Sequence, residues 1–148
     1  MVKGKKHMSA YIDSNIFIYS IIDGGPFGEL AREILELVQS GALDAFTSVL
    51  TFDEIVYVVK KTKGQTQAIA AGTAFLDFNN LRIVEAKKET TRIALKAMEE
   101  YSLLPRDAIH YGTMKLLGLT EIISEDKDFR KIKEINCHTI KDFLKNSE

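Results

Sequence analysis

The stretch AYIDSNIFIY, residues 10–19, is an apolar run that one carboxylate and two small polar residues interrupt. It is short and leads into a helix-length apolar stretch, a pattern that predicts a buried strand ending at Asp13 and turning into a helix. Ligands of open α/β sheets bind at the carboxyl ends of the strands. A carboxylate at such an end must be paired, solvated or bound to a cation, because an isolated buried charge is too costly. Asp13 is therefore the first candidate for a functional residue.

Length and composition fit one globular domain. The chain has 148 residues, of which 45% are hydrophobic and 28% charged, and Cys137 is the single cysteine. Such a chain can bury a sufficient core without an internal disulfide. The sequence contains neither a secretory signal nor a long apolar span, so we expect a cytoplasmic protein without a membrane segment.

The first residues, MVKGKKH, are basic and poor in apolar side chains. We interpret residues 1–7 as an expression leader and residues 8–148 as the domain. Leaving out the leader removes three lysines and lowers the formal net charge from −1 to −4. Sequence-independent affinity for nucleic acid comes mostly from Lys and Arg meeting phosphates, so an acidic domain needs a local site where a metal ion supplies positive charge.

Apolar segments with strand and helix periods alternate along the chain. Further strands are expected at 43–47, 81–84 and 121–124, and helices at 14–22, 27–40, 50–62, 64–78, 88–102, 106–117 and 129–132. Pro105 is expected just outside the helix that ends at residue 117. Ser14 or Asn15 is the expected N-cap of the first helix, Ser48 or Thr51 that of the third. A last pair of apolar segments lies at 137–140 and 143–144. This alternation predicts a three-layer α/β/α domain around a mainly parallel sheet.

Four further acids fall where strands end or helices begin: Glu54, Asp107, Asp126 and Asp128. Parallel topology brings these positions to the edge of the sheet that also carries Asp13. A divalent cation neutralises such a cluster, and an all-oxygen set suits Mg²⁺ or Mn²⁺ rather than zinc. Such a site activates water and stabilises a leaving oxygen, which predicts metal-assisted phosphodiester hydrolysis.

Each acid also has a simpler explanation when it is taken alone. Asp107 suits the positive end of a helix dipole, and Glu54 suits a solvated helix start. Asp126 and Asp128 stand in a charged stretch that is usually an exposed loop. Asp13 resists such an explanation, since it interrupts a run that should be buried. The shared placement of all five acids favours the metal site.

Three segments resemble a known family: AYIDSNIFIYS (10–20), TSVLTFDEIVYVVKK (47–61) and PRDAIHYGTMKLLGLTEIISEDKDFRKI (105–132). Together they resemble a PIN domain, in particular the archaeal and bacterial VapC-type toxin ribonucleases, over residues 10 to about 144. The resemblance implies an α/β/α nuclease that cuts RNA with Mg²⁺ or Mn²⁺. It also implies a small antitoxin partner and a homodimer.

The resemblance assigns the metal and the reaction to four acids: Asp13, Glu54, Asp107 and Asp126. It assigns supporting hydroxyls to Ser14 and Ser124. Many of these toxins carry an Asn in the region of SEDKDF and one more residue before the Asp-Phe pair, whereas this chain has a shorter form with two acids. We rank Asp126 ahead of Asp128, which remains open as a further metal ligand or a helix-start residue.

Other polar and aromatic residues receive structural interpretations. Arg106, Lys127, Arg130 and Lys131 are expected on a solvated basic face rather than at phosphates. His110 is expected to be packed and hydrogen-bonded, since no second His or Cys stands near it. Tyr11, Phe17 and Tyr19 are expected in the core.

Four functions are compared. The first is an endoribonuclease toxin, and the second an RNA-processing PIN nuclease without an antitoxin, which the sequence does not separate from the first. The third, an inactive nucleic-acid-binding module, gains nothing from clustered negative charge beside phosphates. The fourth, a phosphotransfer or phosphatase fold, would want a second Asp two residues after Asp13, where Asn15 stands, and a glycine-rich phosphate loop is missing.

Overall fold

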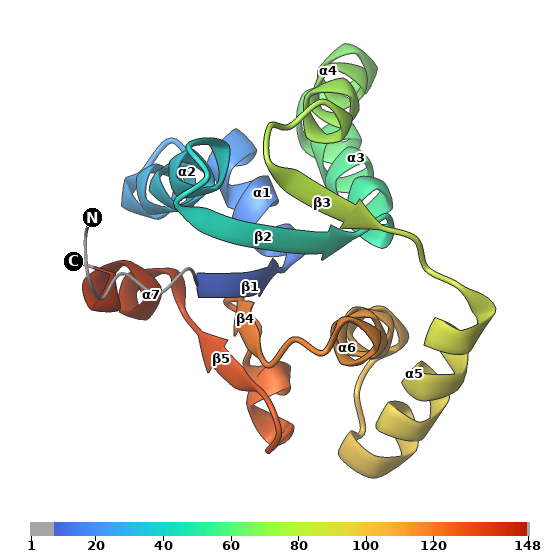
Figure 1. Ribbon diagram of the computed structural model, residues 1–148. Coiled ribbons are helices and arrows are strands. Elements are labelled where there is room, and N and C mark those ends of the chain that lie inside the picture. Colours follow the sequence, from blue (N-terminus) through green and yellow to red (C-terminus); the bar gives the residue numbers. More distant parts are fainter. Residues whose placement is uncertain (1–7, 148) are drawn as a thin grey trace.

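Within residues 8–147, the part of the chain that the computed structural model describes, five parallel strands form one sheet in the order β3-β2-β1-β4-β5 (Figure 1). The strands are β1 (Met8–Ile12), β2 (Leu43–Ser48), β3 (Leu81–Val84), β4 (Glu121–Ile123) and β5 (Asn136–His138). The helices are α1 (Ser14–Ile22), α2 (Pro26–Gln39), α3 (Leu50–Lys63), α4 (Gln65–Leu76), α5 (Lys88–Tyr101), α6 (Pro105–Leu117), the 3₁₀ helix η1 (Lys127–Lys131) and α7 (Ile140–Asn146).

The residues directly before Asp13 form β1, the central strand of the sheet. β1 pairs in parallel with β2, where Ala10 lies opposite Ala45, and with β4, where Ile12 lies opposite Ile123. Parallel neighbours require crossover connections, which here are helical. The carboxyl ends of β1, β2 and β4 therefore meet at one edge of the sheet.

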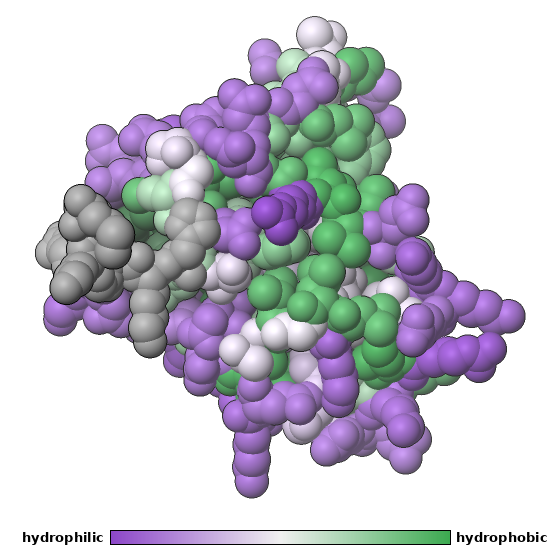
Figure 2. Space-filling view, in the orientation of Figure 1, coloured by the Kyte–Doolittle hydropathy of each residue, from purple (hydrophilic) through white to green (hydrophobic). Residues whose placement is uncertain are grey.

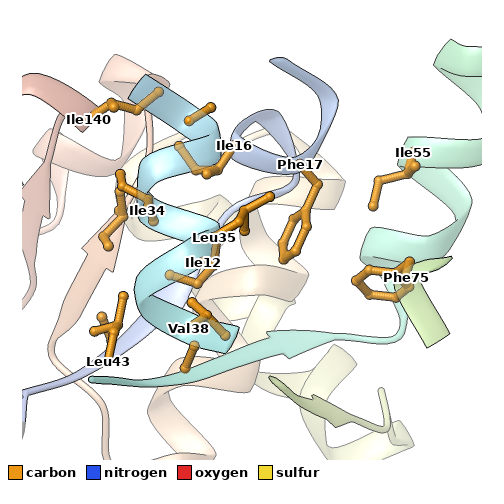
Figure 3. Close-up of a cluster of buried hydrophobic side chains, with 14 of the residues drawn as sticks. Ile12, Ile16, Phe17, Ile34, Leu35, Val38, Leu43, Ile55, Phe75 and Ile140 are labelled. Carbon is orange, nitrogen blue, oxygen red and sulfur yellow. The ribbon is translucent and has the colours of Figure 1, made fainter. Parts of the chain in front are cut away.

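Side chains of β1 alternate between two apolar cores. Ile12 packs in the core under α1, α2, α3, α4 and α7, whereas Tyr11 lies in the core under α5, α6 and η1, as the two-residue period of a strand requires. In Figure 3, Ile12 lies beside side chains of α2, and Phe17 of α1 faces Phe75 of α4 with ring centroids 5.4 Å apart. The sheet is the middle of three layers, which confirms the predicted α/β/α class.

Helix α6 approaches α5 closely because Gly112 has no side chain. A Cβ atom at Gly112 would lie 2.8 Å from the carbonyl oxygen of Thr90 in α5, closer than non-bonded atoms pack. Since α6 also carries Asp107 and His110, this contact helps to set the position of both.

The start of α1 differs from the expected one. Asp13, rather than Ser14 or Asn15, is the N-cap, and its carboxylate accepts a hydrogen bond from the Ser14 backbone N–H. The cap thus draws the carboxylate toward the helix N-terminus, where negative charge is favoured.

Other predicted boundaries also change. Val49, rather than Ser48 or Thr51, is the N-cap of α3. Pro105 is the first residue of α6 instead of lying just outside it, a position that suits proline because the missing N–H has no partner there. The segment at 137–140 contributes a short edge strand, β5, which the apolar pattern alone did not identify as a strand.

The leader expected at residues 1–7 lies outside the described residues. Among the helices of residues 8–147, none is long and apolar enough to cross a membrane.

Candidate metal centre

Asp13 lies between β1 and α1 and is only 4% exposed. Its Oδ1 accepts a hydrogen bond of 2.7 Å from the Ser14 N–H. Its Oδ2 accepts bonds from the Ser124 hydroxyl (2.5 Å) and the Asn15 amide (3.2 Å). Burial raises the pKa of Asp13, while His110 and the Ser124 hydrogen bond oppose that rise. The carboxylate is therefore fixed in orientation without a neutralising Lys or Arg contact among the described residues.

Glu54 reaches the same edge from the first turns of α3. Its Oε1 lies 2.6 Å from Nε2 of His110, a fully buried residue of α6. The same Nε2 lies 3.9 Å from Oδ1 of Asp13. His110 thus stands between two of the predicted acids, and its expected packed, hydrogen-bonded state is confirmed.

Asp107 is half-buried in the first turn of α6. Burial raises its pKa to about 8, helped by a hydrogen bond with the Asp126 side chain and by the negative charges of Asp126 and Asp13. A carboxylate so close to another disfavours the charged form of its neighbour. Asp107 of α6 and Asp126 of the loop after β4 therefore lie close enough for each to act on the other.

Asp128 joins this pair. Carboxylate oxygens of Asp107, Asp126 and Asp128 all lie within 4.8 Å of one another. Asp126 is the N-cap of η1, where its Oδ1 accepts a 2.9 Å hydrogen bond from the Asp128 N–H. The Asp126 N–H in turn donates to the Ser124 hydroxyl, at 2.9 Å. Ser124 therefore connects Asp13 with the loop that carries the last two acids.

The five acids at this edge of the sheet fit a hard divalent cation. Their carboxylates offer only oxygen atoms as ligands, which Mg²⁺ and Mn²⁺ prefer. Oxygen atoms of Asp107, Asp126 and Asp128 lie within 4.8 Å of one another, and burial together with this crowding raises the pKa of Asp107. A bound cation would relieve the repulsion among the three acids. The residues present therefore fit a divalent metal site.

All the predicted acids come to the carboxyl edge of the sheet, in two groups. Asp13 and Glu54 lie on either side of His110, and the other three acids form the tight cluster beside them. The negative charge of Asp13 also contributes to the raised pKa of Asp107. Ser124 and Ser14 both contact Asp13, Ser14 mainly through its backbone N–H.

The basic residues near the cluster are exposed. Arg106 forms an ion pair of 3.6 Å with exposed Asp53, and Lys131 one of 3.3 Å with Asp128. Lys127 and Arg130 are exposed as well. The expected exposure of these four side chains is confirmed.

Asn15 and the pair Tyr11–His110 were not predicted as parts of the site. Asn15 binds Asp13 and, through Oδ1, accepts a 3.4 Å bond from the Glu125 N–H. Tyr11 binds His110 from the core side of β1. A polar residue two positions after Asp13 was the available signal for Asn15, whereas Tyr11 carried no local signal.

The family model of the PIN domain matches residues 10–135 of the chain. Among known proteins, Ribonuclease VapC2 of Methanocaldococcus jannaschii is 24% identical over 135 residues, which cover 82% of this chain and 87% of that protein.

Two solved structures show the same fold. VapC20 of Mycobacterium tuberculosis, described as a toxin that cleaves the sarcin-ricin loop, has a TM-score of 0.69 and 17% identity, with 82% of this chain and 92% of that chain covered. DNA-bound VapBC of Salmonella typhimurium has a TM-score of 0.69 and 18% identity. The match covers 91% of this chain and 99% of that chain.

Proposed function

The chain belongs to the PIN domain family, and on that premise we propose that it is an endoribonuclease that depends on Mg²⁺ or Mn²⁺ and hydrolyses RNA phosphodiester bonds. One observation carries the proposal. Carboxylates from the ends of β1 and β4 and from the starts of α3 and α6 converge on one edge of the sheet. So much clustered negative charge destabilises a protein unless it binds a cation.

The proposed ligands are Asp13, Glu54, Asp107 and Asp126, with Asp128 as a further candidate. When bound, the cation would lower the pKa of a water molecule and stabilise charge on the phosphodiester oxygens. The protein's own contribution is to hold the acids in place. Ser124, Asn15 and the Ser14 N–H orient Asp13, while Ser124 also orients the backbone of Asp126.

RNA is the proposed substrate for two reasons. A metal-activated water can hydrolyse a phosphodiester bond, and relatives with this fold act on RNA. Ribonuclease VapC2 carries that activity in its name, and VapC20 is described as cleaving the sarcin-ricin loop. An acidic domain has little general affinity for nucleic acid, so the metal site would supply most of the attraction for phosphate.

A small antitoxin protein is the proposed partner, because a solved structure from Klebsiella pneumoniae with the same fold is described as a toxin-antitoxin complex. Apolar residues gather over the region of α3, α4 and α6 in Figure 2. Tyr57 and Ile69, each 59% exposed, and Leu104, 66% exposed, are among the exposed apolar side chains of these helices and their caps. Large exposed apolar patches mark protein interfaces. An antitoxin and a second copy of the chain are the proposed occupants, in the cytoplasm.

An RNA-processing nuclease without an antitoxin shares the same chemistry. A neighbouring reading frame for a small protein that co-purifies with this chain and blocks cleavage would favour the toxin. The inactive binding module is the alternative from another class, and direct assay of cleavage separates it from both nucleases.

The test is incubation of a mixed single-stranded RNA with the purified protein and Mg²⁺ or Mn²⁺. We expect cleavage that EDTA stops and Asp13→Asn abolishes. Asp53→Asn is the matched control, because Asp53 lies beside Glu54 in sequence but is exposed and pairs with Arg106; it should cleave like the wild type. Intact RNA with either metal, from folded protein free of a partner, would overturn the proposal.

A further inference from the structure

A chain of hydrogen bonds runs from the core to the acidic cluster. The hydroxyl of Tyr11 in β1 lies 2.5 Å from Nδ1 of His110 in α6, and Nε2 of His110 lies 2.6 Å from Oε1 of Glu54 in α3. Tyr11 and His110 are fully buried, and the Glu54 side chain is 16% exposed. Two side chains that water does not reach therefore connect the core with the partly exposed carboxylate of Glu54.

The direction of the last bond follows from chemistry. A carboxylate only accepts hydrogen bonds, so the hydrogen between His110 and Glu54 belongs to Nε2. At the other ring nitrogen, Nδ1, the Tyr11 hydroxyl is the hydrogen-bond partner; it donates to a neutral imidazole and accepts from a protonated one. In both states Nε2 donates to Glu54, and the bond to Tyr11 holds the ring in the orientation that this contact needs.

Glu54 depends on this contact more than the other acids depend on theirs. Asp13 accepts hydrogen bonds from Ser14, Asn15 and Ser124, and Asp126 is fixed as a helix cap. Glu54 has a longer side chain, and His110 is its one hydrogen-bond donor among the described residues. Without that donor the side chain would be free to adopt several rotamers.

We propose that His110, held by Tyr11, is a positioning residue that fixes the Glu54 carboxylate for cation binding. The inference rests on the proposed metal-dependent function and assigns a role to two residues outside the acid set. His110 acts through Glu54. Partners of metal-binding carboxylates commonly change metal affinity about 10–100-fold when they are removed.

The test measures Mn²⁺ affinity by isothermal titration calorimetry on the full chain, which does not depend on RNA cleavage. We expect His110→Leu to bind Mn²⁺ about 10–100-fold more weakly. His110→Gln should recover most of the affinity, because its amide nitrogen donates from nearly the place of Nε2. Tyr11→Phe removes one oxygen and should weaken binding by a smaller factor, up to about 10-fold.

Tyr111→Phe is the matched control. Tyr111 is also buried against α5, and its ring packs edge-on against Tyr101, away from the hydrogen-bond chain; its variant should bind like the wild type. If His110→Leu does not fold, Tyr11→Phe decides alone, and wild-type affinity in that variant overturns the inference. If His110 were positively charged and merely repelled the cation, His110→Leu would bind Mn²⁺ more tightly than the wild type. That result would also overturn the inference. Absence of Mn²⁺ binding by the wild type would instead refute the proposed function, and the inference with it.

Discussion

Ser124 and Asp13 are 111 positions apart in the sequence, yet the Ser124 hydroxyl donates a 2.5 Å hydrogen bond to Oδ2 of Asp13. Ser124 follows β4 and Asp13 follows β1, which are paired strands in the sheet. The same hydroxyl accepts from the Asp126 N–H. One small side chain thus connects the two strand ends that carry acids.

Ser124→Ala should weaken Mn²⁺ binding about 10-fold, because Asp13 loses its shortest side-chain donor and the Asp126 N–H loses its acceptor. The free energy of unfolding should fall by about 1–2 kcal/mol, the usual cost of a lost buried hydrogen bond. Calorimetric titration and urea unfolding measure the two effects. Thr113→Val is the control, since buried Thr113 bonds only within its own helix, to Ile109; an equal loss of metal affinity there would contradict the role of Ser124.

Stability of the metal-free protein should fall as pH rises from about 4 to about 8. The pKa of Asp107, raised to about 8 by burial and by contact with Asp126, exceeds the usual carboxyl value of about 4. The folded protein therefore holds more protons than the unfolded chain in this window, and the free energy of unfolding decreases with pH. The melting temperature in EDTA, measured at several pH values, checks this.

Asp107→Asn removes the carboxyl group that causes this pH dependence. The melting temperature of the metal-free variant should therefore change less with pH and exceed that of the wild type near pH 9. Saturating Mn²⁺ should raise the wild-type melting temperature more at pH 8 than at pH 6, since cation and proton compete for the same oxygens. Asp77→Asn, at the end of α4, is the control. A pH profile of Asp107→Asn identical to that of the wild type would contradict the raised pKa of Asp107.

The sequence predicted what local patterns and parallel topology determine. Asp13 was identified because a charge interrupts an apolar run, and the helix-start acids because such starts lie at the carboxyl edge of a parallel sheet. The strand at 81–84 and the helix starts at 50 and 88 were also placed correctly.

Local sequence patterns could not predict contacts between segments that lie far apart in the chain. Tyr11 and His110 are 99 positions apart, and Glu54 and His110 are 56 apart. Nothing near Tyr11 distinguishes it from an ordinary core tyrosine, since its hydroxyl partner comes from another element. Strand β5 was missed because three residues are too few to show a period.

Gly112→Ala should destabilise the protein although alanine favours helices by about 1 kcal/mol. The added Cβ would lie 2.8 Å from the Thr90 carbonyl oxygen, a backbone atom that moves only with α5, and such overpacking costs about 1–3 kcal/mol. Thermal unfolding checks the sign. Gly24→Ala is the control, because a Cβ at Gly24 meets no atom within 4 Å; equal melting temperatures of the two variants would contradict this account of the α5–α6 contact.

Asp126 and Asp128 make different contacts, which predicts different effects of their removal. Asp126 contributes to the raised pKa of Asp107, caps η1 and connects to Ser124 through its backbone, whereas Asp128 forms an ion pair with Lys131. Asp126→Asn should therefore abolish metal-dependent cleavage and weaken Mn²⁺ binding strongly. Asp128→Asn should keep measurable cleavage and lose about 10-fold or less in affinity, the range of a supporting group. Parallel titrations and cleavage rates separate the two positions. A larger loss in Asp128→Asn than in Asp126→Asn would make Asp128 the fourth ligand and Asp126 its structural support.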